Sequence, residues 1–269
     1  MLLSAVFTLR SQQAASLRVD QGRAVHGLFL DWLRQADQAL AQHIHDADGA
    51  KPFTVSSLRG ARVQQDRIPL QPGQECWFRL TSFGPELSTV LSQCVLHQLP
   101  DELTLSDVPF LLTGATTDGG EHPWASRTGY AELAQEMMLA AEEPPPWLNL
   151  RFASPTAFHS QKRHLPLPLP RLAVEGWLKK WNRFAPLRLH EDANRFAEEC
   201  LAISRYRLET RPVRFGSATI VGFVGRCTFR FLNRDRYWMR VLHLLAAFSF
   251  YCGTGHKTTM GMGQTRPVV

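Results

Sequence analysis

The sequence predicts an α+β protein made of two successive units, each with the element order β-α-β-β-α-β. Short segments in which apolar and polar residues alternate are typical of strands, and longer segments with apolar residues every three to four positions are typical of helices. These segments follow one another in the same order twice along the chain. The order is that of the ferredoxin-like fold. We therefore expect two tandem ferredoxin-like domains, with no obvious repetition of sequence between them.

The first half of the chain supplies one complete unit. Its first helix is amphipathic, with Val25, Phe29 and Leu33 on one face. A polar loop at residues 42–51 follows this helix. The predicted strands are residues 2–10, 52–56, 75–83 and 103–113, and the predicted helices are residues 25–41 and 85–98.

The second half repeats the order after a stiff Glu-Glu-Pro-Pro-Pro segment at residues 142–146. Such a segment is typical of a domain boundary, so we expect domains at residues 1–143 and 144–269. Residues 154–170 are too long for an ordinary connection, which favours a functional loop. The predicted strands are residues 147–153, 200–208, 218–232 and 263–268. The predicted helices are residues 130–141, in the linker, then 171–184, 192–199 and 237–251.

Charge is distributed unevenly between the halves. Residues 1–149 contain 10 Lys and Arg against 17 Asp and Glu, a balance of −7, whereas residues 150–269 contain 20 against 7, a balance of +13. Their sum is the net charge of +6 of the whole chain. A half this basic indicates a polyanion-binding surface. Most of the positive charge is arginine, which suits phosphate contacts and base stacking.

Composition excludes several classes of protein. The five cysteines are dispersed without a CxxC pair, so the sequence supports neither a disulfide framework nor a zinc site. The first ten residues lack the basic start of a signal peptide, and no apolar run approaches the roughly 20 residues of a membrane span. We therefore expect a soluble cytoplasmic protein without metal or cofactor.

A glycine-rich stretch near the C-terminus is the most informative segment. Glycines permit positive φ and close backbone approach, and successive free N–H groups beside a lysine form a phosphate nest. A hairpin that only reverses the chain is the structural alternative. The Rossmann and P-loop patterns do not fit, because Thr258 and His256 stand where each motif needs a glycine. The stretch contains Gly253, Gly255, His256, Lys257, Thr258, Gly261 and Gly263.

Four separated motifs resemble the CRISPR-associated endoribonucleases that cut precursor CRISPR RNA, the Cas6 family. The glycine-rich stretch resembles that family's glycine-rich loop, and the segment 221–225, Val-Gly-Phe-Val-Gly, resembles the start of its long central strand. The segment 151–158, Arg-Phe-Ala-Ser-Pro-Thr-Ala-Phe, resembles its second-domain entry strand. His45, followed six residues later by Lys51, resembles its catalytic segment. The motifs occur in the family's order from the first strand to the last.

The resemblance implies two ferredoxin-like domains, binding of one CRISPR repeat, and a single metal-independent cut. The products would carry a 2′,3′-cyclic phosphate and a 5′-hydroxyl. The mature RNA would then pass to, or stay within, an interference complex, and the protein would act as a monomer or homodimer.

The chemistry implied needs a base for the 2′-hydroxyl, compensation of phosphate charge, and a proton for the leaving oxygen. Imidazole suits the proton transfers, and a lysine suits the charge. The family spacing favours His45 as base and Lys51 as the electrostatic residue, with His43 as the rival base. Some relatives add a tyrosine on the preceding helix, which this chain lacks.

RNA binding is assigned to the basic second half, where arginines alternate along strands and are expected to share a sheet face. They would grip a stem or its flanks, since A-form RNA is bound through shape and backbone. Arg236 and Arg240, at the start of the last helix, belong to the same expectation. The candidates outside the glycine-rich stretch are Lys162, Arg163, Arg205, Arg207, Arg226, Arg230 and Arg234.

Two other functions compete with the endoribonuclease. One is a non-catalytic subunit that binds repeat RNA in an interference complex, against which the His45–Lys51 pair argues. The other is a ferredoxin-like regulator or RNA-modifying protein, which the ordered motifs disfavour. If the endoribonuclease hypothesis holds, the glycine-rich stretch would bind the RNA backbone, and it must come together with the catalytic residues of the first half.

Overall fold

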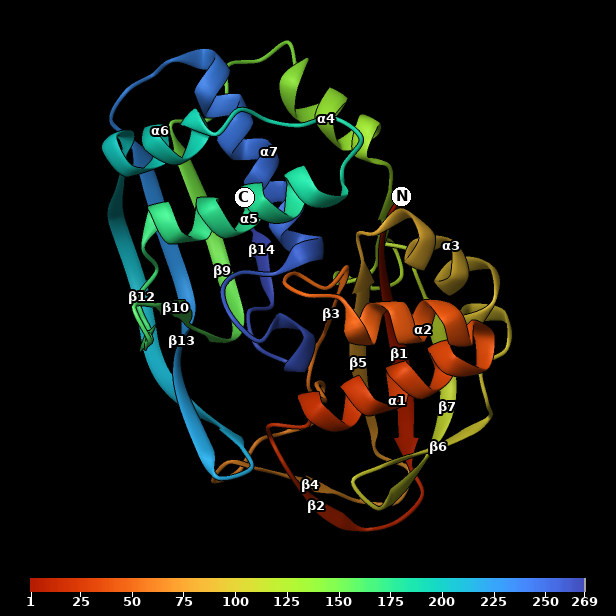
Figure 1. Ribbon diagram of the computed structural model, residues 1–269. Helices are drawn as coiled ribbons and strands as arrows, with labels where there is room; N and C mark the ends of the chain where they lie inside the picture. The colour runs from red at the N-terminus through yellow and green to blue at the C-terminus, as the bar shows by residue number, and fades with distance from the viewer. Residues whose placement is uncertain (269) are drawn as a thin grey trace. The chain divides into compact units, whose positions relative to one another are not determined.

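The first unit is built on an antiparallel sheet in the order β3-β5-β1-β7-β6, with β8 also pairing to β1. The computed structural model describes residues 1–268 (Figure 1). This unit comprises residues 1–127 together with residues 259–261. Its strands are β1 (Leu2–Ser11), β3 (Phe53–Val55), β5 (Glu75–Ser82), β6 (Glu102–Leu105), β7 (Val108–Thr116) and β8 (Ser126–Thr128), and a separate pair is formed by β2 (Ala15–Arg18) and β4 (Arg67–Leu70).

Helices cover one face of this sheet (Figure 1). They are α1 (Gly22–Ala36), α2 (Gln38–Asp46) and α3 (Pro85–Gln93), followed by the 3₁₀ turn η1 (Val95–His97). Phe7 of β1 stacks on Phe78 of β5 at 4.9 Å between ring centroids. Phe29 of α1 packs on Phe53 of β3 at 4.7 Å. This apolar layer fixes α1 and β3 against each other.

The second unit has a four-stranded antiparallel sheet in the order β12-β13-β9-β14. Its strands are β9 (Trp147–Thr156), β12 (Leu201–Phe215), β13 (Ala218–Phe231) and β14 (Thr265–Pro267). The helices are α4 (Tyr130–Met138), α5 (Pro170–Phe184), α6 (Asp192–Cys200) and α7 (Arg236–Cys252). Helices α5, α6 and α7 lie on one face of the sheet (Figure 1).

Burial alternates strictly along β9. Leu148, Leu150 and Phe152 are buried, whereas Asn149 and Arg151 point to the opposite face. A strand places successive side chains on opposite faces, so one face of the second sheet packs under its helices and the other is left open. We call the latter the open face.

Both units therefore have the strand order second, third, first, fourth, which is the ferredoxin-like arrangement. The predicted α+β class and tandem fold are confirmed. The first half of the polar loop predicted at residues 42–51 is helical instead, and residues 47–51 are irregular. Asp37 ends the first helix and caps the next, its carboxylate accepting from the Leu40 amide at 2.9 Å, so α2 continues to Asp46.

Two other segments differ from their predicted form. Residues 103–113 form not one strand but the hairpin β6–β7, because Ser106 and Asp107 both adopt positive φ and turn the chain. The predicted long loop contains a second hairpin, β10 (Phe158–Ser160) and β11 (Arg163–Leu165), with Gln161 and Lys162 at its positive-φ tip. Asn, Gly and Asp usually mark such turns; Gln-Lys gives no such signal.

The structure divides the chain at Arg127 and Thr128, ahead of the proline-rich segment. The reason is that α4 packs in the second unit. Tyr130 lies edge-on to Trp181 at 5.0 Å and packs against Phe248 at 5.8 Å. The proline-rich segment therefore joins α4 to β9 within one compact unit.

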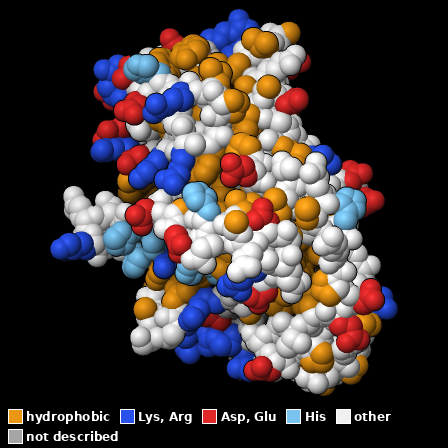
Figure 2. Space-filling model, turned by 45° about the vertical axis from the view of Figure 1, so that its right-hand side comes forward, with side chains coloured by type: hydrophobic (Ala, Val, Ile, Leu, Met, Phe, Trp, Pro, Cys, Tyr) orange, Lys and Arg blue, Asp and Glu red, His pale blue; other side chains and the backbone are white. Residues whose placement is uncertain are grey.

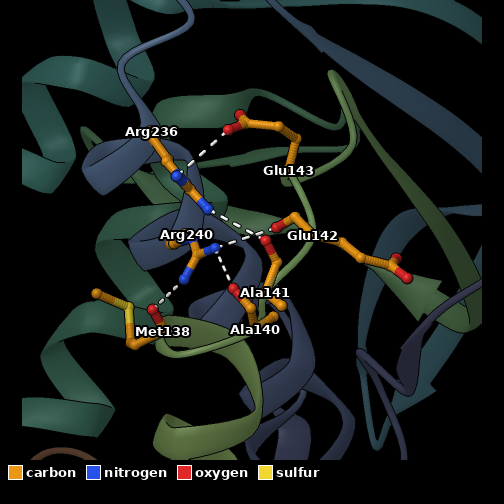
Figure 3. Close-up of polar contacts among 7 residues, drawn as sticks. All are labelled: Met138, Ala140, Ala141, Glu142, Glu143, Arg236 and Arg240. Carbon is orange, nitrogen blue, oxygen red and sulfur yellow. Dashed lines mark hydrogen bonds and ion pairs between the residues drawn. The ribbon is translucent and has the colours of Figure 1, made fainter.

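Arginine side chains at the start of α7 bind the carbonyls that follow α4 (Figure 3). The guanidinium of Arg240, 8% exposed, donates to the carbonyls of Met138, Ala140 and Glu142. Arg236 donates to Ala141 at 3.3 Å and pairs with Glu143 at 3.4 Å. The carbonyls at a helix end need such partners. Arg240 is therefore structural, which corrects its grouping with the RNA-binding arginines.

Within the described residues, none of the helices combines the length and the hydropathy that crossing a bilayer requires. The five cysteines are free thiols.

Candidate functional site

A half-buried histidine on α1, His26, is the centre of a polar cluster in the first unit. Its Nδ1 lies 2.9 Å from the carbonyl oxygen of Thr259. A carbonyl only accepts, so Nδ1 carries the hydrogen and Nε2 keeps a free lone pair. The ring stacks on Phe53 at 5.6 Å with an interplanar angle of 27°. Both contacts fix the orientation of the imidazole.

Burial lowers the pKa of His26 below its ordinary 6.5, and the charges of His45 and Lys51 lower it further. The hydrogen bond to Thr259 acts in the opposite direction but is the smaller effect. Neutral imidazole is therefore favoured near pH 7, with Nε2 able to accept a proton. The sequence prediction missed His26, because the carbonyl that orients it lies more than 200 residues away along the chain.

The candidates His43 and His45 both lie on α2, in its last turn. Ile44, between them, is buried and anchors the helix, and both histidines are exposed. Residues two apart on a helix are separated by about 200° around its axis. The charge of His45 lowers the pKa of His26. Which of the two histidines takes part in catalysis stays a prediction.

Lys51 binds the C-terminal end of α2. Its Nζ donates to the carbonyls of Ile44 at 2.5 Å, His45 at 2.8 Å and Ala47 at 2.5 Å. A cation is favourable at a helix C-terminus. The ammonium therefore fixes the turn that carries His45, a role that the predicted six-residue spacing did not reveal.

The glycine-rich segment is folded tightly on itself. Gly253, Gly255, Gly261 and Gly263 all have positive φ, between 65° and 91°. A Cβ at Gly263 would lie 2.2 Å from the Thr254 carbonyl oxygen, and one at Gly255 would lie 2.4 Å from that of Ala157. Only glycine fits such backbone contacts. The four glycines are explained by this geometry.

Several amides of the glycine-rich segment already donate to backbone carbonyls. The N–H of Thr254 donates to Gly263 at 2.8 Å, that of Gly263 to Pro155 at 3.0 Å, and that of His256 to Ala157 at 2.8 Å. The side chain of Thr258 is also buried, against Gly253 and Gly263. These amides therefore shape the segment. Lys257 is exposed at its surface and His256 is half-buried. Phosphate binding by the segment stays a prediction.

Three histidines meet beside the β10–β11 hairpin. His159 and His164 are opposite each other in the hairpin, with ring centroids 5.2 Å apart. His256 lies 5.5 Å from the first and 5.7 Å from the second. Figure 2 shows histidines gathered at the base of a projecting segment with basic side chains. Burial and the nearby Lys257 lower the pKa of His256 to about 4, so it is neutral near pH 7.

The basic residues predicted to bind RNA outside the glycine-rich segment fall into three groups. Arg205, Arg207, Arg226 and Arg230 lie on the open face, as their register and exposure require. Lys162 and Arg163 lie on the β10–β11 hairpin, and Arg234 is exposed between β13 and α7. Register thus gathers the four strand arginines on one surface and separates Arg234 from them.

Two family models match the chain. One, described as the CRISPR Cas6 N-terminal domain, matches residues 1–135, half of the chain. The other, described as CRISPR-associated endoribonuclease Cas6, matches residues 150–265. The chain belongs to the Cas6 family. Its two matched regions correspond closely to the two ferredoxin-like units.

Curated Cas6 proteins are similar to parts of the chain. Streptococcus thermophilus Cas6 is 30% identical over 137 residues, 49% of this chain and 56% of that protein. A Mycobacterium tuberculosis Cas6 is 29% identical over 120 residues, 44% of this chain and 38% of that protein. The matches thus span about half or less of these relatives' length.

Solved Cas6 structures match over the whole length. A Thermus thermophilus Cas6, solved as a product complex, is 27% identical with a TM-score of 0.82, and all of both chains is covered. Another Cas6 product complex is 26% identical with a TM-score of 0.77, covering 100% of this chain and 99% of that one. The likeness includes both units.

We predict opposite effects on stability for two glycines of α1. In Gly22→Ala the new Cβ would lie 2.1 Å from the Met260 carbonyl oxygen, whereas at Gly27 no atom lies within 4 Å. Overpacking should lower the free energy of unfolding of Gly22→Ala by about 1–3 kcal/mol. Gly27→Ala should raise it by up to about 1 kcal/mol, through helix propensity. Urea denaturation measures both. Equal stability of the two variants would contradict the close contact between α1 and residues 259–261.

Proposed function

We propose that this Cas6 protein cleaves precursor CRISPR RNA within its repeat, by attack of the RNA's own 2′-hydroxyl and without a metal ion. The products would carry 2′,3′-cyclic phosphate and 5′-hydroxyl ends. The observation that carries the proposal is the oriented, neutral His26 coupled to His45 and Lys51. The names of its relatives as endoribonucleases and their structures as product complexes support it.

The two histidines divide the proton transfers. His26 suits the base, because its depressed pKa keeps Nε2 unprotonated near pH 7 and the Thr259 carbonyl aligns the ring. His45, exposed on the last turn of α2, would then protonate the 5′-oxygen as it leaves. This assignment reverses the expectation that His45 is the base. The nucleophile comes from the RNA, so two imidazoles can supply both proton transfers.

Lys51 would act as a positioning residue. Its ammonium binds three carbonyls at the end of α2 and so holds the turn on which His45 lies. The compensation of phosphate charge expected of Lys51 would be a lesser contribution, because those carbonyls already occupy its donors.

RNA binding would use the basic second unit. Lys257 of the glycine-rich segment, with Lys162 and Arg163 on the hairpin, would supply positive charge, and the neutral His256 could add a hydrogen bond to the RNA. The arginines of the open face form another surface. Binding should weaken steeply with salt, because phosphate contacts release counterions.

The reaction type is tested with repeat RNA in excess chelator and with a 2′-deoxy nucleotide at the scissile position. Cutting should persist in chelator and stop with the 2′-deoxy substrate, because the nucleophile is then missing. Denaturing gels of end-labelled RNA measure both. Loss of cutting in chelator, or cutting of the 2′-deoxy RNA, would refute the mechanism. Tight binding without cutting of any repeat RNA would favour the non-catalytic subunit.

The assignment of His45 is tested against His43 on the same helix turn. His45→Ala should slow single-turnover cleavage by about 10²–10⁴-fold, the usual contribution of a general acid or base. His43→Ala should cleave at nearly the normal rate, and both variants should bind repeat RNA as tightly as the parent. If His43→Ala abolishes cleavage and His45→Ala does not, the assignment is wrong.

A further inference from the structure

The open face of the second sheet carries a row of four arginines in register. Arg207 of β12 is opposite Arg226 of β13, Arg226 is opposite Arg151 of β9, and Arg151 is opposite Arg266 of β14. The first three are exposed and Arg266 is half-buried. Like charges directly opposite each other destabilise a sheet. The three exposed arginines therefore repel one another unless an anion lies across them.

Few carboxylates offset this row. Within residues 1–268, the guanidinium groups of Arg151, Arg207 and Arg226 form no ion pair. The three side chains line a hollow of about 610 Å³, which Glu209 also lines. The carboxylate of Glu209 is bound by Arg211 at 2.5 Å. The hollow is thus a cationic surface with room for a ligand.

Two further rows of cross-strand neighbours lie on the open face, next to the arginine row along the strands. We call each such row a rung. In the next rung, Arg205 is opposite Thr228, which is opposite Asn149. The Thr228 hydroxyl donates to Asn149 Oδ1 at 2.8 Å, which leaves the amide Nδ2 of Asn149 as a donor. A second hollow of about 370 Å³ is lined by residues of these two rungs. The last rung pairs Arg230 with Trp147, whose indole is 50% exposed.

We propose that the open face binds a single-stranded part of the RNA, with a base stacked on Trp147 and successive phosphates on the arginine rungs. An indole can stack only on a base whose face is free, which a paired stem does not offer. An aromatic side chain among arginines on an open four-stranded sheet is a combination that suits unpaired RNA. This inference rests on the proposed function only in taking RNA as the ligand.

The dimensions suit a short segment of RNA. Three strand spacings of about 4.8 Å make the arginine row about 14 Å wide, and the four residue steps from Trp147 to Arg151 span about 13 Å along β9. A four-stranded sheet of this kind stacks two or three bases. The surface therefore fits a few nucleotides that flank a stem rather than the stem itself.

The test is equilibrium binding of fluorescently labelled hexaadenylate RNA and of a fully paired RNA hairpin, measured by anisotropy at several salt concentrations. Trp147→Ala should weaken hexaadenylate binding by roughly 5- to 150-fold, the usual effect of removing one stacking partner. Trp147→Phe should restore most of the affinity. Hairpin binding should change little in either variant.

The arginine row is tested through the salt dependence. Each phosphate contact with a single strand contributes about 0.7 to the slope of log K against log salt, so R207A/R226A should reduce the slope for hexaadenylate by about 1.4. The matched control is R171A/R195A, which removes the same charge from the exposed faces of α5 and α6. The control should leave the slope unchanged.

Three results would overturn the inference. These are hexaadenylate binding by Trp147→Ala with parental affinity, an equal loss of hexaadenylate and hairpin binding in the open-face variants, or an equal slope change in the control. None of these measurements involves cleavage. Failure of the parent to cut repeat RNA would therefore refute the proposed function but not the binding of single-stranded RNA to the open face. Failure of the binding predictions would refute the open-face proposal but not the proposed cleavage.

Discussion

The close contact between the backbone of residues 259–261 and the start of α1 is the constraint on which the candidate catalytic cluster depends. It leaves no space for a side chain at Gly22, and it brings the Thr259 carbonyl to within 2.9 Å of the His26 ring. That carbonyl sets the tautomer of His26 and so decides which nitrogen can accept a proton. A segment near the C-terminus thereby controls the chemistry available to a histidine near the N-terminus.

The two units carry different kinds of polar residue, each set by local packing. In the first unit, burial and nearby charge keep His26 neutral, and the Lys51 ammonium donates hydrogen bonds to carbonyls at the C-terminal end of α2. In the second unit, the strand register lines up arginines on an uncovered sheet face, where repulsion between them favours an anionic ligand. The proposed proton transfer requires a neutral imidazole and the proposed RNA binding requires positive charge, so the two functions would use different elements of the chain.

The fold could be predicted because its pattern is local: alternating strands and amphipathic helices reveal their order without knowledge of tertiary contacts. The same logic placed Arg205 and Arg207 on one face. What could not be predicted depends on distant partners. The His26 ring is oriented by a carbonyl more than 200 residues away, and several amides of the glycine-rich segment donate to Pro155, to Ala157 and within the segment. The hairpin at Gln161–Lys162 was missed because its turn residues are not the usual ones.

The proposed chemistry requires His26 to be a neutral imidazole protonated on Nδ1. The direct measurement is a pH titration of the histidine ring nitrogens by ¹⁵N NMR, with His26 assigned by comparison with His26→Gln. We expect a hydrogen on Nδ1 at pH 7 and a pKa below the ordinary 6.5, because burial outweighs the hydrogen bond to Thr259. A hydrogen on Nε2, or a pKa at or above 6.5, would contradict it.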